Sequence, residues 1–215
     1  VYILNDYKDI KEDRKHPKKK FRPLATGLIS KNTALSSMII LLIAGFTLMA
    51  IISIKALVIL SIYVILNILY SLKLKRIAVL DVTIIAIGFV SRLFVGSFAY
   101  EIQLTIWIVI MTFLLALFMA LAKRRDDILI YLKSGNEMRK SIDGYNLQLV
   151  DGSMMIMSSV VIVAYLLYTT SQEIIEKFQS ENLYLTTLFV IFGLMRYLQI
   201  TLVEKNSGSP TEIIL

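Results

Sequence analysis

Three aspartates and an asparagine near the start of the chain have a spacing that suits metal binding. If this segment is helical, Asp6, Asp9 and Asp13 stand at positions i, i+3 and i+7, on one broad face. Asn5 lies one turn before Asp9 and shares that face. Carboxylates held this close repel each other, and hard oxygen ligands suit Mg²⁺ that also contacts a substrate's phosphates. We therefore predict a site for Mg²⁺ and a diphosphate, with the metal ligands Asn5, Asp6, Asp9 and Asp13.

The same segment carries lysines that offer an alternative interpretation. Lys8, Lys11 and Lys15 could pair with the acids on a solvated helix end. Because an asparagine and three aspartates share one face beside strongly apolar segments, we favour the metal site over this alternative.

The composition indicates an integral membrane protein. Of the 215 residues 57% are hydrophobic, and the mean hydropathy is +0.71, whereas soluble domains are about 45–50% apolar. A helix needs about 20 residues to cross a bilayer. Residues 1–4 resemble the end of another apolar helix. We predict an all-α, polytopic transmembrane helical bundle whose complete spans lie near 33–54, 56–72, 77–99, 103–122, 147–170 and 183–203.

No linker, low-complexity tract or repeat divides the chain, so we expect one transmembrane domain over residues 1–215. The sequence starts with Val1 inside a helix, without a methionine or a signal peptide. We therefore expect a fragment that is truncated at both ends, and we expect these 215 residues alone to be poorly stable and catalytically silent.

The distribution of cations orients the predicted spans. The segments 5–32, 73–76, 123–146 and 204–215 would lie on one side of the membrane, and they carry 19 of the 23 lysines and arginines. The opposite connections carry only Lys55 and Lys177. The positive-inside rule places the cation-rich side in the cytoplasm. We predict a bacterial plasma-membrane protein with a cytoplasmic active site, and the excess of cations is no argument for nucleic acid.

Two further charged clusters follow predicted spans. Lys73, Lys75 and Arg76 precede Asp81, and the run from Lys123 to Asp127 precedes Asp151. Cations at these places could be membrane anchors, but three in a row beside two acids favour an anion clamp over residues 123–125. Asp81 and Asp151 would line the site, because a carboxylate at the mouth of an apolar span needs a polar cavity.

Other kinds of site lack the residues that they require. The chain has no cysteine and one histidine, His16, so a zinc site and an acyl-transfer triad are unsupported. No glycine-rich phosphate loop is present. Arg92 and Arg196 are the only cations within predicted spans, and each could either meet a phosphate in a cavity or form a buried structural pair.

Residues 5–27, NDYKDIKEDRKHPKKKFRPLATG, resemble the first aspartate motif of the UbiA superfamily of intramembrane prenyltransferases. Several stretches are similar to its decaprenyl-phosphate phosphoribosyltransferase branch: His16-Pro17, YSLKLKRIAVLDVTIIAIGFVSRLFVG at 70–96, AKRR at 122–125 and GSPTEIIL at 208–215. Members that prenylate aromatic compounds carry a second motif, with DxxxD spacing, between their sixth and seventh helices. The corresponding region of this sequence, from Lys123 to Asp151, lacks that spacing.

The resemblance implies transfer of a phosphoribosyl group from phosphoribosyl pyrophosphate to a polyprenyl phosphate, for cell-envelope polysaccharide precursors. It implies nine helices around a cavity open to lipid, of which the first, most of the second and the ninth would be absent here. The motif aspartates would hold Mg²⁺ against the pyrophosphate, with Asp81 and Asp151 completing the catalytic set. The expected substrate-binding residues are Asn5, Arg14, Lys20, Arg22, Tyr70, Lys73, Lys75, Lys123, Arg124, Arg125, Arg139 and Tyr145.

Two alternatives remain open. A prenyltransferase that acts on an aromatic or quinone precursor would use the same Mg²⁺ site with a prenyl diphosphate. A transporter or scaffold would use the charged loops only to bind anionic lipid, but lipid binding does not require Asn5, Asp6, Asp9 and Asp13 on one face. The oligomeric state is left open, a homo-oligomer included.

Overall fold

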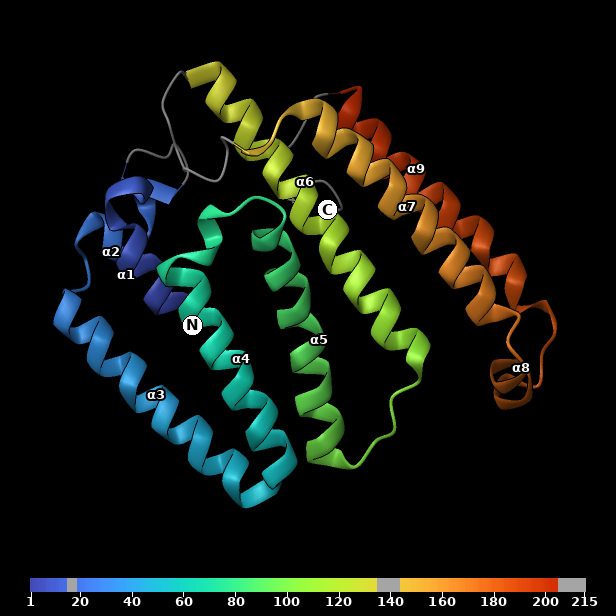
Figure 1. The fold of residues 1–215 in the computed structure, drawn as a ribbon, viewed down its shortest axis with the longest axis horizontal. Helices are drawn as coiled ribbons and strands as arrows, with labels where there is room; N and C mark the ends of the chain where they lie inside the picture. The colour runs from blue at the N-terminus through green and yellow to red at the C-terminus, as the bar shows by residue number, and fades with distance from the viewer. Residues whose placement is uncertain (15–18, 135–143, 205–215) are drawn as a thin grey trace. The chain divides into compact units, whose positions relative to one another are not determined.

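The computed structural model describes residues 1–14, 19–134 and 144–204, and every regular element in them is a helix (Figure 1). Six stretches are long and apolar enough to cross a membrane. They are α3 (Lys31–Ile52), α4 (Ile54–Leu72), α5 (Leu80–Tyr100), α6 (Ile106–Ser134), α7 (Leu147–Thr169), and α9 (Thr187–Leu202) with the preceding 3-10 turn η4 (Asn182–Thr186). The predicted all-α bundle with six spans is confirmed.

The helices form two compact units. The first contains every helix up to α5 together with Gly144, and the second contains α6 to α9. In the first unit α4 packs against both α3 and α5, and the three spans run side by side (Figure 1). Ser53 alone separates α3 from α4 and caps α4, because its hydroxyl accepts from the Ala56 amide at 3.4 Å.

Short helices occupy one end of the first unit. They are α1 (Tyr2–Asp13), the 3-10 turn η1 (Lys19–Phe21), α2 (Pro23–Thr26) and the 3-10 turn η2 (Leu74–Arg76), which joins α4 to α5. Pro23 starts α2 with a φ that suits a helix, and Gly27 ends it at φ +86°. Ile10, Leu24 and Ala34 form a buried cluster between α1, α2 and α3. This packing fixes α1, and with it the predicted metal motif.

In the second unit α7 and α9 lie side by side (Figure 1). Asn146 caps α7, since its side-chain oxygen accepts from the Leu149 amide at 2.7 Å. Helix α6 is joined to α9 by Phe118 and Tyr197, whose ring centroids are 5.3 Å apart. The short α8 (Gln172–Phe178) follows α7.

The predicted end of the fourth span is wrong. We expected 103–122 to be followed by a loop, but α6 continues to Ser134 and takes in the cations from Lys123 to Arg125. Residues 123–134 contain no proline or glycine, and their lysines, arginines and leucines are good helix formers. Arg124 also pairs with Asp127 one turn later at 2.6 Å. The charged run is therefore part of a helix, and its side chains have fixed partners.

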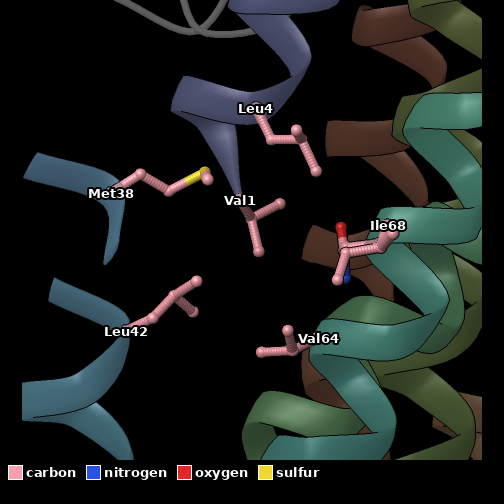
Figure 2. Close-up of a pocket in the computed structure, with 7 residues that line it drawn as sticks. Val1, Leu4, Met38, Leu42, Val64 and Ile68 are labelled. Atoms are coloured by element: carbon pink, nitrogen blue, oxygen red, sulfur yellow. The ribbon is translucent and has the colours of Figure 1, made fainter. Parts of the chain in front are cut away.

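An apolar cavity of about 40 Å³ lies between α1, α3 and α4 (Figure 2). Figure 2 shows Val1, which precedes α1, and Leu4 of α1 facing residues of the other two helices. The remaining lining residues are Met38, Leu42, Val64, Asn67 and Ile68. The cavity has room for only a few water-sized groups, and no charged side chain lines it. It therefore does not suit a phosphate.

Candidate functional site

One guanidinium nitrogen joins two carboxylates of the predicted metal motif. The Nη1 atom of Arg22 donates to Asp6 Oδ1 at 2.7 Å and to Asp13 Oδ2 at 3.0 Å. The Asp13 side chain is nearly buried, while those of Arg22 and Asp6 keep 32% and 28% of their surface exposed. The helical spacing predicted from the sequence thus brings two of the carboxylates to a single cation.

The third carboxylate of the motif pairs with a cation from a distant part of the chain. The ammonium group of Lys75, in η2, donates to Asp9 Oδ1, and both side chains are almost fully buried. Lys75 was predicted to bind substrate phosphate. In this structure it neutralises Asp9 and ties α1 to the connection between α4 and α5.

The four predicted metal ligands have donor chemistry that fits Mg²⁺. The buried side-chain oxygen of Asn5 accepts no hydrogen bond within the described part of the chain. Asp6 and Asp13 already converge on one positive atom, and Mg²⁺ is commonly held by one or two carboxylates plus phosphate oxygens. No three acidic or histidine side chains among the described residues close on one point. The full set of four ligands therefore stays a prediction.

The electrostatic environment of Asp6 favours an additional positive charge. Burial raises the pKa of Asp6 above its ordinary value, and the nearby carboxylates of Asp13 and Asp9 act in the same direction, whereas Arg22 lowers it. A cation placed beside Asp6 would thus stabilise its ionised form.

The other residues predicted for this site take different positions in the first unit. Arg14 Nε donates to the Ala25 carbonyl at 2.9 Å and so links the end of α1 to α2. Lys20 lies over the Phe21 ring at 5.1 Å. Lys73 is exposed at the end of α4, and Tyr70 is half-buried one turn earlier. Asp81 is fully buried in the first turn of α5, and its predicted place at the site stays a prediction.

A tight turn precedes Asp81. The Leu80 amide donates to the Ala78 carbonyl at 2.8 Å, and Val79 between them has φ 68° and ψ −46°. A γ-turn of this hand is rare and strained, above all for a β-branched residue. Gly144 packs on the same turn, and a Cβ at that position would lie 2.5 Å from the Ala78 Cβ. No pattern in the sequence predicts this contact.

The cationic run of the second unit is held by protein groups. Arg125 donates through Nε to Asp151 Oδ1 at 2.7 Å and through Nη1 to the Thr201 carbonyl at 2.6 Å. Arg124 pairs with Asp127, and both are buried. Arg125 therefore joins α6 to α7 and to the end of α9. This arrangement accounts for Arg124, Arg125 and Asp151 as structural groups, and their predicted contact with substrate stays untested.

Three further residues were predicted to bind substrate: Lys123, Arg139 and Tyr145. Lys123 is exposed on α6, and Tyr145 is buried just before α7. Arg139 lies outside the described residues, as do His16, Pro17 and the GSPTEIIL tail. Lys123, Arg139 and Tyr145 stay predictions.

A family model described as the UbiA prenyltransferase family matches residues 1–211. The chain belongs to the UbiA prenyltransferase family. This confirms the resemblance drawn from the first aspartate motif, and with the six apolar spans it identifies a multi-pass membrane protein of a transferase family.

Two relatives within the UbiA family carry the same name, decaprenyl-phosphate phosphoribosyltransferase. The protein from Mycolicibacterium smegmatis is 27% identical over 221 residues, which covers 100% of this chain and 69% of the relative. The protein from Corynebacterium glutamicum is 29% identical over 170 residues, which covers 78% of this chain and 51% of the relative. The chain thus spans between half and about two thirds of the length of these relatives.

Solved UbiA structures share the fold. A UbiA homologue from Archaeoglobus fulgidus bound to GPP and Mg²⁺ superimposes with a TM-score of 0.76 at 19% identity, covering 99% of this chain and 75% of that one. The same homologue bound to DMAPP and Mg²⁺ gives 0.75 at 20% identity. At this identity the likeness establishes the helical architecture.

Proposed function

We propose that the protein transfers the 5-phosphoribosyl group of phosphoribosyl pyrophosphate to a polyprenyl phosphate of the decaprenyl type. The observation that carries the proposal is the pairing of the α1 carboxylates with cations from two other elements: Asp6 and Asp13 pair with Arg22, and Asp9 pairs with Lys75. Such a mixed cluster suits a metal-bound diphosphate. The relatives named decaprenyl-phosphate phosphoribosyltransferase support the choice of substrates.

In the proposed reaction an oxygen of the lipid phosphate forms a bond to the anomeric carbon of the ribose. The bond from that carbon to pyrophosphate breaks, and pyrophosphate leaves with the electron pair. A lipid phosphate is already ionised at neutral pH, so the protein needs no strong general base. In-line displacement would invert the anomeric centre and give a β-linked product.

We propose that Asn5, Asp6, Asp9 and Asp13 hold Mg²⁺ at the donor. When bound, Mg²⁺ would supply positive charge that stabilises the departing pyrophosphate. Lys75 holds Asp9 in place, and Arg22 can turn from its carboxylates toward a phosphate because its side chain is partly exposed. Lys20 and Lys73 belong to the same unit as α1, and their positive charges would attract the anionic donor.

The distribution of cations supports a cytoplasmic site. The carboxylate cluster lies in segment 5–32, one of the cation-rich segments, and the positive-inside rule assigns these to the cytoplasm. Phosphoribosyl pyrophosphate is a soluble metabolite, so a site on that side could take it directly.

Prenyl transfer to an aromatic acceptor is a second candidate. The Archaeoglobus fulgidus structures were solved with GPP and with DMAPP, and they share the fold of this chain. The region from Lys123 to Asp151 argues against this candidate, because it lacks the DxxxD motif of the aromatic prenyltransferases.

A donor competition separates the two functions. Membranes that contain the protein would be supplied with polyprenyl phosphate, an aromatic acceptor, phosphoribosyl pyrophosphate and a prenyl diphosphate, and the lipid products would be separated by chromatography. We expect a ribose-containing lipid that is absent from membranes with Asp9→Asn. A prenylated aromatic compound without a ribose-containing lipid would refute the proposal.

A further inference from the structure

Arg92 is a charged side chain inside a membrane-spanning helix, and its hydrogen-bond partners are neutral. Its Nη2 donates to the hydroxyl oxygen of Tyr63, in α4, at 2.6 Å, and Nε donates to the same oxygen at 3.2 Å. Nη2 also donates to the hydroxyl oxygen of Tyr2, in α1, at 3.4 Å. Three helices of the first unit thus meet at one guanidinium.

Two other arginines of the long helices have carboxylate partners. Arg196, the second arginine within a span, contacts Glu204 at 3.1 Å, and Arg125 contacts Asp151 at 2.7 Å. Arg92 has no carboxylate partner in the described part of the chain. Its guanidinium instead lies 5.2 Å from the ring centres of Tyr63 and Phe89. Aromatic faces attract a cation but leave its charge uncompensated, and an uncompensated charge in a span is costly.

The groups around Arg92 can still donate hydrogen bonds. Tyr63 and Tyr2 each use the phenol oxygen to accept from Arg92, so each O–H proton is available to another group. Arg92 Nη1 makes no hydrogen bond within the described residues, and the Arg92 side chain is exposed. Two O–H groups and a guanidinium edge that converge in this way match a tetrahedral oxyanion.

The cluster of Arg92, Tyr63 and Tyr2 lies on the side of α1 that carries the carboxylates. Tyr2 precedes Asp9 by seven residues, which is two turns of helix, or about 10 Å. Tyr2 and Asp9 therefore share a face. An anion at Arg92 would be separate from a diphosphate at Asp9, yet it could belong to the same substrate or to a second one bound beside it.

We propose that Arg92, Tyr63 and Tyr2 form a second anion subsite, which takes a phosphate monoester. The inference rests on the proposed function to the extent that both proposed substrates carry such a group. One is the 5-phosphate of phosphoribosyl pyrophosphate, and the other is the headgroup of polyprenyl phosphate. The subsite would thus select one substrate by its monoester, at a distance from the metal site.

Direct binding tests this subsite without turnover. Ribose 5-phosphate and farnesyl phosphate carry the two monoesters without a diphosphate, and each would be titrated calorimetrically into the whole protein in lipid nanodiscs. Arg92→Gln should weaken one of the two ligands by about 10- to 100-fold, the usual worth of a hydrogen bond to a charged group. Arg92→Lys, which keeps the charge, should give an intermediate loss. A loss for ribose 5-phosphate assigns the subsite to the donor, and a loss for farnesyl phosphate assigns it to the acceptor.

Two further variants keep the inference falsifiable. Tyr63→Phe retains the ring but removes the hydroxyl, and it should weaken the same ligand by several-fold even if Arg92→Gln does not fold. Arg196→Gln removes the other arginine of the spans and should leave both affinities unchanged. Unchanged binding in Arg92→Gln and Tyr63→Phe, or an equal loss of both ligands, would overturn the subsite. Failure of phosphoribosyl transfer with Arg92-dependent binding intact would refute only the proposed reaction.

Discussion

Lys75 and Asp9 form a buried ion pair although 66 positions separate them in the sequence. The pair connects η2, between two membrane spans, to the helix that carries the predicted metal ligands. Taking a charge out of water is costly unless a partner compensates it. The position of Asp9 therefore depends on the folding of α4 and α5, and so does any metal site that includes Asp9.

Lys75→Met should destabilise the protein strongly, because it leaves Asp9 buried with one counter-charge fewer. Breaking a buried pair from one side costs about 3–5 kcal/mol. Thermal unfolding in lipid nanodiscs would measure the loss, and adding Asp9→Asn to Lys75→Met should recover part of it. Lys73→Met changes an exposed lysine two positions away and should stay within about 0.5 kcal/mol of the parent. Equal effects of the two methionine variants would show that the pair contributes nothing.

Arg22→Gln should raise the affinity of the donor-free protein for divalent cations. The Arg22 guanidinium occupies oxygens of Asp6 and Asp13, so a metal must compete with it. Two partly exposed ion pairs are worth about 0.2–1 kcal/mol each, so losing both corresponds to a gain of about two- to thirtyfold in metal affinity. Electron paramagnetic resonance of free Mn²⁺ would follow the titration. Lys31→Gln removes the same charge from the exposed start of α3 and serves as the control. Weaker Mn²⁺ binding by Arg22→Gln would show that Arg22 assists the metal rather than competing with it.

Asp9→Asn should lose most of the transferase activity. By analogy with the loss of an oxyanion-hole donor, removing one preorganised electrostatic contact should cost about 2.7–4 kcal/mol, or about 10²- to 10³-fold in rate. Raising Mg²⁺ should restore part of the activity, because the loss would lie in metal binding. Glu12→Gln neutralises an exposed acid on another face of α1 and should keep near-normal rates. Near-normal turnover of folded Asp9→Asn at low Mg²⁺ would exclude Asp9 as a metal ligand.

Local patterns in the sequence were enough to predict the spans and the face of α1. A run of about 20 apolar residues is a local property, and so is the i, i+3, i+7 spacing of Asp6, Asp9 and Asp13. The end of α6 was misplaced because charged residues were taken as the end of a span. They continue the helix, since Arg124 and Arg125 find partners that offset their burial.

Contacts between distant residues could not be predicted. The pairing of Lys75 with Asp9, of Arg125 with Asp151 and of Arg92 with Tyr63 depends on how helices pack. A single sequence marks each of these residues as charged or polar, but it gives no sign of the partner. This is why Lys75 and Arg125 were predicted to contact substrate phosphates, whereas the structure gives them protein partners.

Gly144→Ala should destabilise the turn before Asp81. The added Cβ would lie 2.5 Å from the Ala78 Cβ, a short side chain that cannot swing away. Overpacking of this kind costs about 1–3 kcal/mol, and the unfolding temperature in nanodiscs would report it. Gly193→Ala, in α9, meets no atom within 4 Å and should be neutral or slightly stabilising. An unchanged unfolding temperature for Gly144→Ala would mean that the turn moves aside freely.

Following the ribose and the pyrophosphate of the donor separately is the most direct test of the proposed phosphoribosyl transfer. Phosphoribosyl pyrophosphate would carry ¹⁴C in its ribose and ³²P in its pyrophosphate group, and membranes with the protein and polyprenyl phosphate would be extracted into organic solvent. Transfer of the phosphoribosyl group predicts that ¹⁴C enters the lipid phase and that an equal amount of ³²P appears in water as pyrophosphate. Absence of ¹⁴C from the lipid, or ³²P that accompanies it there, would contradict the proposed reaction.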